Sequence, residues 1–211
     1  MTRALAIGYT ETMARLKGAA ATAFLLALIL PGCSRDRLGP PPPGTHRRAP
    51  SAPIVYYLDG AASEGLELGV REAFQLWSDA SAFKFSYGGK ARLRAARDGR
   101  NAVILEKKWP EELPIGAAAW CQVYLDGAGR IVESDILLNA QAFEFTTKRE
   151  ARAGALYVED VLSREIGRSL GIDSGGEGGD QYRRAAAGDG FEPGIDPAEM
   201  AAYLSLYAAG N

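Results

Sequence analysis

The residues of this sequence that could do chemistry gather in one stretch, LSREIGRSLGIDSGG, from Leu162 to Gly176. On a helix, Arg164 and Arg168 lie four residues apart on one face, with Glu165 beside them. A carboxylate can serve as a general base, but a guanidinium stays protonated at ordinary pH and has no lone pair for a metal. Taken alone, the spacing predicts an amphipathic helix with its arginines on the solvated side. A salt-bridged face, in which the arginines pair with Glu165, is the more specific expectation.

Histidine and cysteine are scarce, which limits the chemistry further. The 211 residues include one histidine, His46, and two cysteines, Cys33 and Cys121. Cys121 lies in the apolar stretch IGAAAWCQVYL, which predicts a buried and inert thiol because the region around it contains no histidine to activate it. A three-ligand zinc site would depend on carboxylates, which hold zinc poorly without nitrogen or sulfur ligands.

The amino terminus has the layout of an export signal. From Met13, the expected true start, a short basic region precedes an apolar run that is too short to cross a membrane comfortably. Residues 1–32 are therefore predicted to be a signal peptide. Leu-Pro-Gly-Cys at its end resembles the lipobox of bacterial lipoproteins, which implies lipid attachment at Cys33; a plain signal peptide with a chance cysteine is the alternative. Ser34 behind that cysteine implies sorting to the outer membrane of a Gram-negative cell envelope.

Residues 33–52 are dense in proline and arginine and offer little to bury. They are predicted to form a tether of polyproline II and coil in which His46 is solvated. The formal charge of the chain is −2, with 24 Lys and Arg against 26 Asp and Glu, and 47% of its residues are hydrophobic. This composition is typical of a globular domain and argues against nucleic acid as a partner.

Residues 53–211 are predicted to form one α+β domain. Strand patterns occur in PIVYYLD, FKFSY and NAVILE, and two further runs flank the glycine-rich turn at 126–130, which favours an antiparallel hairpin. Apolar residues at helical spacing predict helices over 63–80 and from Tyr157 to Leu170, where Gly171 is a good helix stop. A last helix is expected over 197–208.

Five segments in order resemble the matrixin family of metzincin zinc metallopeptidases, in its short bacterial form. They are REAFQLWSDASAFKF, NAVILEKKWPEELPIGAAA, GRIVESDILLN, YVEDVLSREIGRSLGIDS and DPAEMAAYLSLYAAG. The resemblance covers Pro53 to Gly210. It implies a twisted, mostly parallel sheet with one antiparallel edge strand, two long helices and a C-terminal helix.

In that family the active-site helix carries H-E-x-x-H-x-x-G-x-x-H, in which three histidines hold zinc and the glutamate polarises the bound water. Laid on this sequence, Arg164, Arg168 and Ser174 stand at the three histidines. Glu165 stands at the general-base position and Gly171 at the motif glycine. The resemblance therefore implies that the zinc ligands have been lost and that Glu165 is inactive.

The family's methionine turn is also missing, because Met200 falls within the last helix, where it is expected to belong to the core. The glycine-rich loop before that helix is acidic, and oxygen-rich loops can bind calcium. Its spacing fits no EF-hand template, so a solvated loop is preferred. The acidic residues concerned are Asp173, Glu177, Asp180 and Asp189.

Two functional interpretations follow. The first is a lipid-anchored pseudopeptidase without a cofactor, whose vestigial cleft binds an extended peptide or protein along the strand near Gly116 to Tyr124. The alternative is an active zinc-dependent metalloendopeptidase with a non-standard metal site.

Overall fold

The computed structural model describes residues 38–39, 46–48, 53–172, 182–185 and 190–208. The chain divides into two compact units, Met1–Ser34 and Arg35–Asn211, and all of the described residues belong to the second. Two of the predicted site residues, Cys33 and Ser174, and the four acidic residues of the glycine-rich loop lie outside the described residues.

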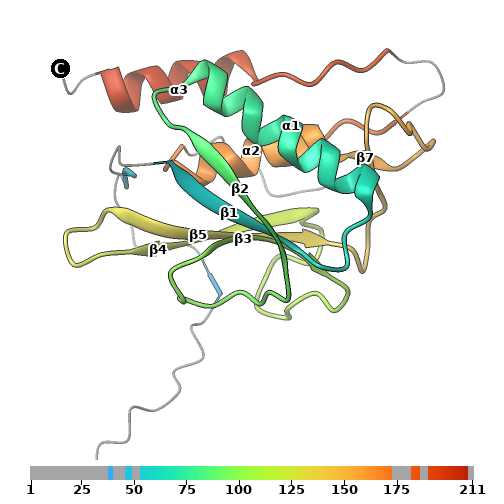
Figure 1. Cartoon of the computed structure of the whole chain (residues 1–211), viewed down its shortest axis with the longest axis horizontal. Helices are drawn as coiled ribbons and strands as arrows, with labels where there is room; N and C mark the ends of the chain where they lie inside the picture. Colours follow the sequence, from blue (N-terminus) through green and yellow to red (C-terminus); the bar gives the residue numbers. More distant parts are fainter. Residues whose placement is uncertain (1–37, 40–45, 49–52, 173–181, 186–189, 209–211) are drawn as a thin grey trace, which may run out of the picture. The chain divides into compact units, whose positions relative to one another are not determined.

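A five-stranded sheet of order β2-β1-β3-β5-β4 forms the centre of this unit (Figure 1). β1 pairs in parallel with β2 and with β3, β3 pairs in parallel with β5, and the edge strand β4 pairs antiparallel with β5. The sheet is thus mostly parallel with one antiparallel edge strand, and the predicted α+β class is confirmed. The strands are β1 (Ile54–Asp59), β2 (Phe85–Ala91), β3 (Asn101–Glu106), β4 (Ala119–Leu125) and β5 (Ile131–Asn139).

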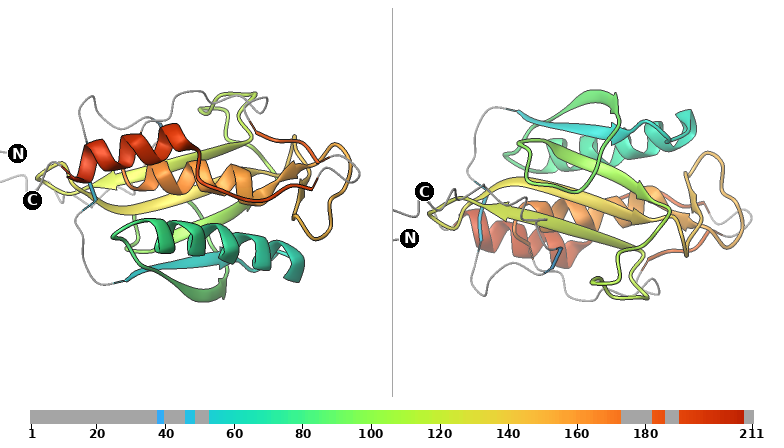
Figure 2. Two further views of the ribbon diagram at one scale, coloured as in Figure 1. Left: turned by 90° about the horizontal axis from the view of Figure 1, so that it is seen from above. Right: turned by 90° about the horizontal axis from the view of Figure 1, so that it is seen from below.

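Three helices, α1 (Glu64–Ala80), α2 (Val158–Ser169) and α3 (Pro197–Ala208), lie on one face of the sheet (Figures 1 and 2). A short parallel pair, β6 (Phe145–Thr146) and β7 (Leu156–Tyr157), precedes α2 and was not predicted from the sequence. Two-residue strands carry no periodicity, so a sequence pattern cannot indicate them. Within the described residues, no helix has both the length and the apolar character that crossing a bilayer requires.

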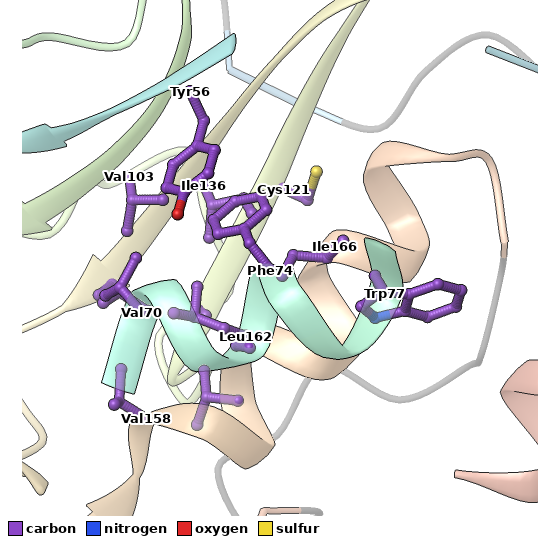
Figure 3. Packing of buried hydrophobic residues seen from close by; sticks show 14 of the residues in the cluster. Tyr56, Val70, Phe74, Trp77, Val103, Cys121, Ile136, Val158, Leu162 and Ile166 are labelled. Atoms are coloured by element: carbon purple, nitrogen blue, oxygen red, sulfur yellow. The ribbon is translucent and has the colours of Figure 1, made fainter. Parts of the chain in front are cut away.

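Helix α1 follows from its local sequence and packs tightly on α2. The hydroxyl of Ser63 caps the helix by accepting a hydrogen bond from the Leu66 amide, 3.2 Å away. Phe74 and Trp77 point into the core that α1 shares with α2 and the sheet (Figure 3). The Trp77 indole donates to the Ser163 carbonyl of α2 at 2.7 Å, and Gly167 lets α2 approach the same ring, since a Cβ there would lie 3.2 Å from it.

Side chains alternate between two cores along β4 and β5. Cys121 and Ile136 belong to the large core under the helices, whereas Trp120 and Leu137 belong to a smaller cluster on the opposite face. This second cluster, defined by Trp109, Leu113, Ala117, Trp120 and Leu137, is covered by loops that follow β2 and β3. Because both faces are covered, all residues of β4 except Leu125 are buried, and Gln122 is the one amide side chain among otherwise apolar and aromatic ones.

Residues 46–48, here called the strap, pack against the domain, although the sequence analysis placed them in the tether. The Ile131 amide donates to the Arg47 carbonyl at 2.9 Å, and His46 Nδ1 lies 3.1 Å from the Gly129 carbonyl oxygen. Arg48 is only 5% exposed. Folded structure therefore extends into residues that composition alone assigns to a solvated linker.

Candidate functional site

Helix α2 carries Arg164, Glu165 and Arg168, the helical residues singled out in the sequence, and it packs against β4, β5 and α3. Val161, Leu162 and Ile166 are fully buried in the large core, which fixes the helix against β4 and β5. This orientation turns Glu165 inward as well, and its side chain has no exposed surface. A buried carboxylate requires partners, because transferring an unpaired charge out of water is costly.

Two side chains supply those partners. Arg168 Nη1 donates to Glu165 Oε1 at 2.5 Å, and the Tyr182 hydroxyl donates to the same oxygen at 2.7 Å. The second oxygen, Oε2, is buried and has no hydrogen-bond partner among the described residues. Burial and the charge of Glu165 raise the pKa of Tyr182, which keeps its hydroxyl protonated as a donor.

Arg168 is a charged partner in this cluster. Burial is the largest single influence and lowers its pKa, but the charge of Glu165, the hydrogen bond to it and the charges of Tyr182 and Cys121 together outweigh burial, so the pKa lies above its ordinary value. The side chain is only 16% exposed, so the prediction from spacing alone, that the arginines lie on the solvated side of the helix, is wrong for Arg168. The expected salt bridge between Glu165 and Arg168 is confirmed.

Arg164 pairs elsewhere, contrary to the prediction of one salt-bridged face. Its guanidinium lies 3.5 Å from Asp196 and 3.9 Å from Glu199, at the start of α3. The two arginines stand one helical turn apart, and each finds a different acidic partner. Arg164 thus ties α2 to α3, while Arg168 neutralises the buried Glu165.

A cavity of about 400 Å³ lies beside Arg164, between α2 and the segment that enters α3. Ser163 lines it and donates to the Gly194 carbonyl at 3.2 Å; Asp160, also in the lining, accepts the Arg183 amide at 2.7 Å. These hydrogen bonds join α2 to the segments that carry Gly194 and Arg183. Because the cavity is lined by charges of both signs, it favours no one class of ligand.

Gly171 ends the helix as predicted. Its φ of +91° lies in the left-handed region, where glycine follows many helices. The strap crosses here as well, since a Cβ on Gly171 would lie 2.0 Å from the His46 carbonyl oxygen. Conformation and close approach both require glycine at this position.

Arg48 of the strap is a site residue that sequence reasoning missed. Its guanidinium donates to the Ser169 carbonyl at the end of α2 at 3.1 Å, to Asn101 at 3.0 Å and to Ser134 at 2.9 Å. Burial lowers its pKa. A cation bound to the last carbonyls of a helix is favoured by the helix dipole. Nothing in a run of proline and arginine distinguishes this arginine from its solvated neighbours.

Cys121 lies on β4, on the side that faces α2, and is buried as predicted. Burial raises the pKa of its thiol well above the ordinary value, and the nearby charge of Glu165 raises it further. A thiol held protonated is a poor nucleophile. The expectation of an inert side chain agrees with this environment.

The residues present at the motif do not fit zinc, the metal that the sequence resemblance implies. Arg164 and Arg168 bring guanidinium groups that have no lone pair and repel a dication. The carboxylate between them is bound to an arginine and a tyrosine. Among the described residues, no three His, Cys, Asp or Glu side chains gather as metal ligands.

Comparison with known proteins finds no protein-family model that matches the chain and no similar sequence among curated proteins.

Proposed function

We propose that this chain is a lipid-anchored, matrixin-like pseudopeptidase that binds an extended peptide or protein segment without hydrolysing it. The observation that carries the loss of activity is the buried cluster of Glu165, Arg168 and Tyr182. A general base must meet the water from which it takes a proton, and here the carboxylate has no exposed surface and its oxygen Oε1 is held by two hydrogen bonds.

The sheet supports the binding half of the proposal. β4 is an antiparallel strand at the edge of a mostly parallel sheet, and α2 packs beside it. An edge strand recognises an extended peptide through backbone hydrogen bonds, which need no metal. Binding could therefore persist after the ligands for catalysis have gone. A mostly parallel sheet with one antiparallel edge strand is also what the sequence resemblance implies, which supports the proposal.

The proposal is tested on the purified unit Arg35–Asn211 by elemental analysis for zinc and by incubation with unfolded casein. We expect no stoichiometric zinc, measurable association with casein and no cleavage products by mass spectrometry. Glu165→Gln should leave all three results unchanged. Stoichiometric zinc, with cleavage that a chelator and Glu165→Gln both abolish, would establish the metalloendopeptidase alternative instead.

A triple variant tests the proposed ancestry of the motif. Arg164→His, Arg168→His and Ser174→His together would supply three nitrogen ligands at the family spacing, and the matched control introduces only the first two. If the inherited geometry persists, the triple variant gains zinc more tightly than the control. Equal zinc content in both variants would count against the matrixin-like assignment.

A further inference from the structure

One loop concentrates positive charge on the face of the sheet opposite the helices. Residues 92–100, here called the basic loop, contain four arginines and one acidic residue, Asp98, in a chain whose formal charge is −2. All four arginines are exposed. Figures 1 and 2 show the loop after β2 on the side of the sheet away from α1, α2 and α3. The arginines are Arg92, Arg94, Arg97 and Arg100.

Buried carboxylates of β5 hold the basic loop in place. The Ala96 amide donates to Asp135 Oδ2 at 3.0 Å. The amides of Asp98 and Gly99 donate to the two oxygens of Glu133 at 2.8 and 2.7 Å. Because the backbone of the loop is anchored at three amides, it has little ordering entropy left to lose when the exposed arginine side chains bind a surface.

The amino-terminal segment meets the same face. Leu38 and Ala95, which belongs to the basic loop, both pack against the second cluster. The Gly39 amide donates to Gln122 Oε1 of β4 at 2.8 Å. Leu38 and Gly39 thus lie on the face of the sheet to which the basic loop belongs.

Chain length limits how far Cys33 can be from this face. It precedes Leu38 by five residues, which span at most about 17 Å even when fully extended. A lipid on Cys33 would therefore keep the bilayer surface within about that distance of Leu38, which allows the basic loop to reach it. The neighbouring turn that carries Ile115, a side chain 92% exposed, covers the second cluster and adds an apolar group to this face.

We propose that the basic loop is a docking surface for an anionic phospholipid bilayer, which orients the domain with its helices away from the membrane. The position of the membrane in this inference rests on the lipid attachment at Cys33 that is part of the proposed function. Negatively charged lipid surfaces attract clustered arginines, and the attraction falls off within about a Debye length of 8–10 Å. A lipid on Cys33 would tether the domain without fixing its orientation, and the electrostatic contact at the basic loop would supply that orientation.

The experiment uses the unit Arg35–Asn211, which lacks Cys33, so that lipid attachment cannot influence the result. Its sedimentation is measured with vesicles of phosphatidylcholine alone and of phosphatidylcholine with phosphatidylglycerol. We expect binding to the anionic vesicles only, lost when the salt rises from about 0.05 to 0.5 M. Arg92→Gln with Arg94→Gln should lower the partition coefficient roughly 10- to 30-fold.

Arg149→Gln with Arg152→Gln is the matched control, because it removes the same charge from exposed arginines outside the basic loop. It should bind as the unchanged protein does. Equal binding to neutral and anionic vesicles, or an equal loss of binding in both double variants, would overturn the proposal. If one variant fails to fold, the salt dependence of the unchanged protein still tests it, because binding that does not weaken with salt would overturn it as well. Lipid attachment is assessed separately by mass spectrometry of the full chain recovered from membranes, so that failure of the anchor and failure of the docking surface are distinguished.

Discussion

At the scale of single residues, the cluster around Glu165 holds a fully buried carboxylate in an internal ion pair. Arg168→Met would leave a fully buried carboxylate with Tyr182 as its remaining described partner. Removing one member of a buried pair commonly costs about 3–5 kcal/mol, whereas replacing both members by neutral groups costs far less. We therefore expect Arg168→Met to lower the free energy of unfolding in urea by about that amount, and Glu165→Gln added to it to restore most of the loss.

An exposed ion pair provides the comparison for that experiment. Lys90 lies 3.0 Å from Glu67, and both side chains are partly exposed. Lys90→Met should lower the free energy of unfolding far less than Arg168→Met does, because solvent screens such pairs. If Arg168→Met lowered the free energy of unfolding no more than Lys90→Met does, the buried ion pair of Arg168 and Glu165 would not stabilise the fold as proposed.

At the scale of elements, the strap joins the end of α2 to the β4–β5 hairpin, and Gly171 is where they meet. Gly171→Ala combines a left-handed φ of +91° with a Cβ only 2.0 Å from the His46 carbonyl oxygen. Gly154→Ala is a matched control, with φ +83° and no atom within 4 Å of the new Cβ. Both variants should lose about 1–3 kcal/mol of unfolding free energy to backbone strain.

The strap contact separates the two variants. The Ile131 amide donates to the Arg47 carbonyl, so displacing the strap should speed hydrogen exchange at Ile131 in Gly171→Ala but leave it slow in Gly154→Ala. Arg48→Met should resemble Gly171→Ala in this measurement, because it removes three hydrogen bonds that hold the strap. Slow exchange at Ile131 in both strap variants would mean that the strap does not depend on these contacts.

The elements that could be predicted from the sequence are those whose signals are local. The spacing of Val70, Phe74 and Trp77 indicates α1, and the proline after Asp196 marks the first turn of α3. Arg48 donates a hydrogen bond to Ser169, which is 121 residues away in the sequence, and a periodic pattern cannot predict such a contact. Tyr182 is another partner of this kind, since the loop that brings it to Glu165 carries no regular pattern. The helix of the candidate site was therefore predictable, but the partners of its charged residues were not.

At the scale of the whole molecule, Asp135 links the stability of the domain to pH. Its carboxyl group lies under the basic loop, where burial, followed by the charges of Glu133 and Asp98, raises its pKa to about 7. The hydrogen bonds from the Ala96 amide and the Tyr124 hydroxyl oppose this shift without cancelling it. In the unfolded chain the same group titrates near the ordinary value of 3.8.

The direction of the pH effect follows from proton binding. Between about pH 4 and pH 7 the folded state holds a proton on Asp135 that the unfolded state has released, so the free energy of unfolding falls as pH rises through this window. A shift of about three pH units corresponds to a loss on the order of 4 kcal/mol, most of it complete by neutral pH.

Asp135→Asn mimics the protonated form and keeps an acceptor for the Ala96 amide, so it should flatten the dependence of the unfolding free energy on pH, measured by urea unfolding. Asp126→Asn is the control on the same hairpin: the pKa of Asp126 is lowered by its hydrogen bonds with Arg130, so this variant should keep the slope between pH 4 and pH 7. If Asp135→Asn left the slope of unfolding free energy against pH unchanged, Asp135 would not be the group that titrates. The pH dependence would then belong to other buried carboxyl groups whose pKa is raised, such as Glu159.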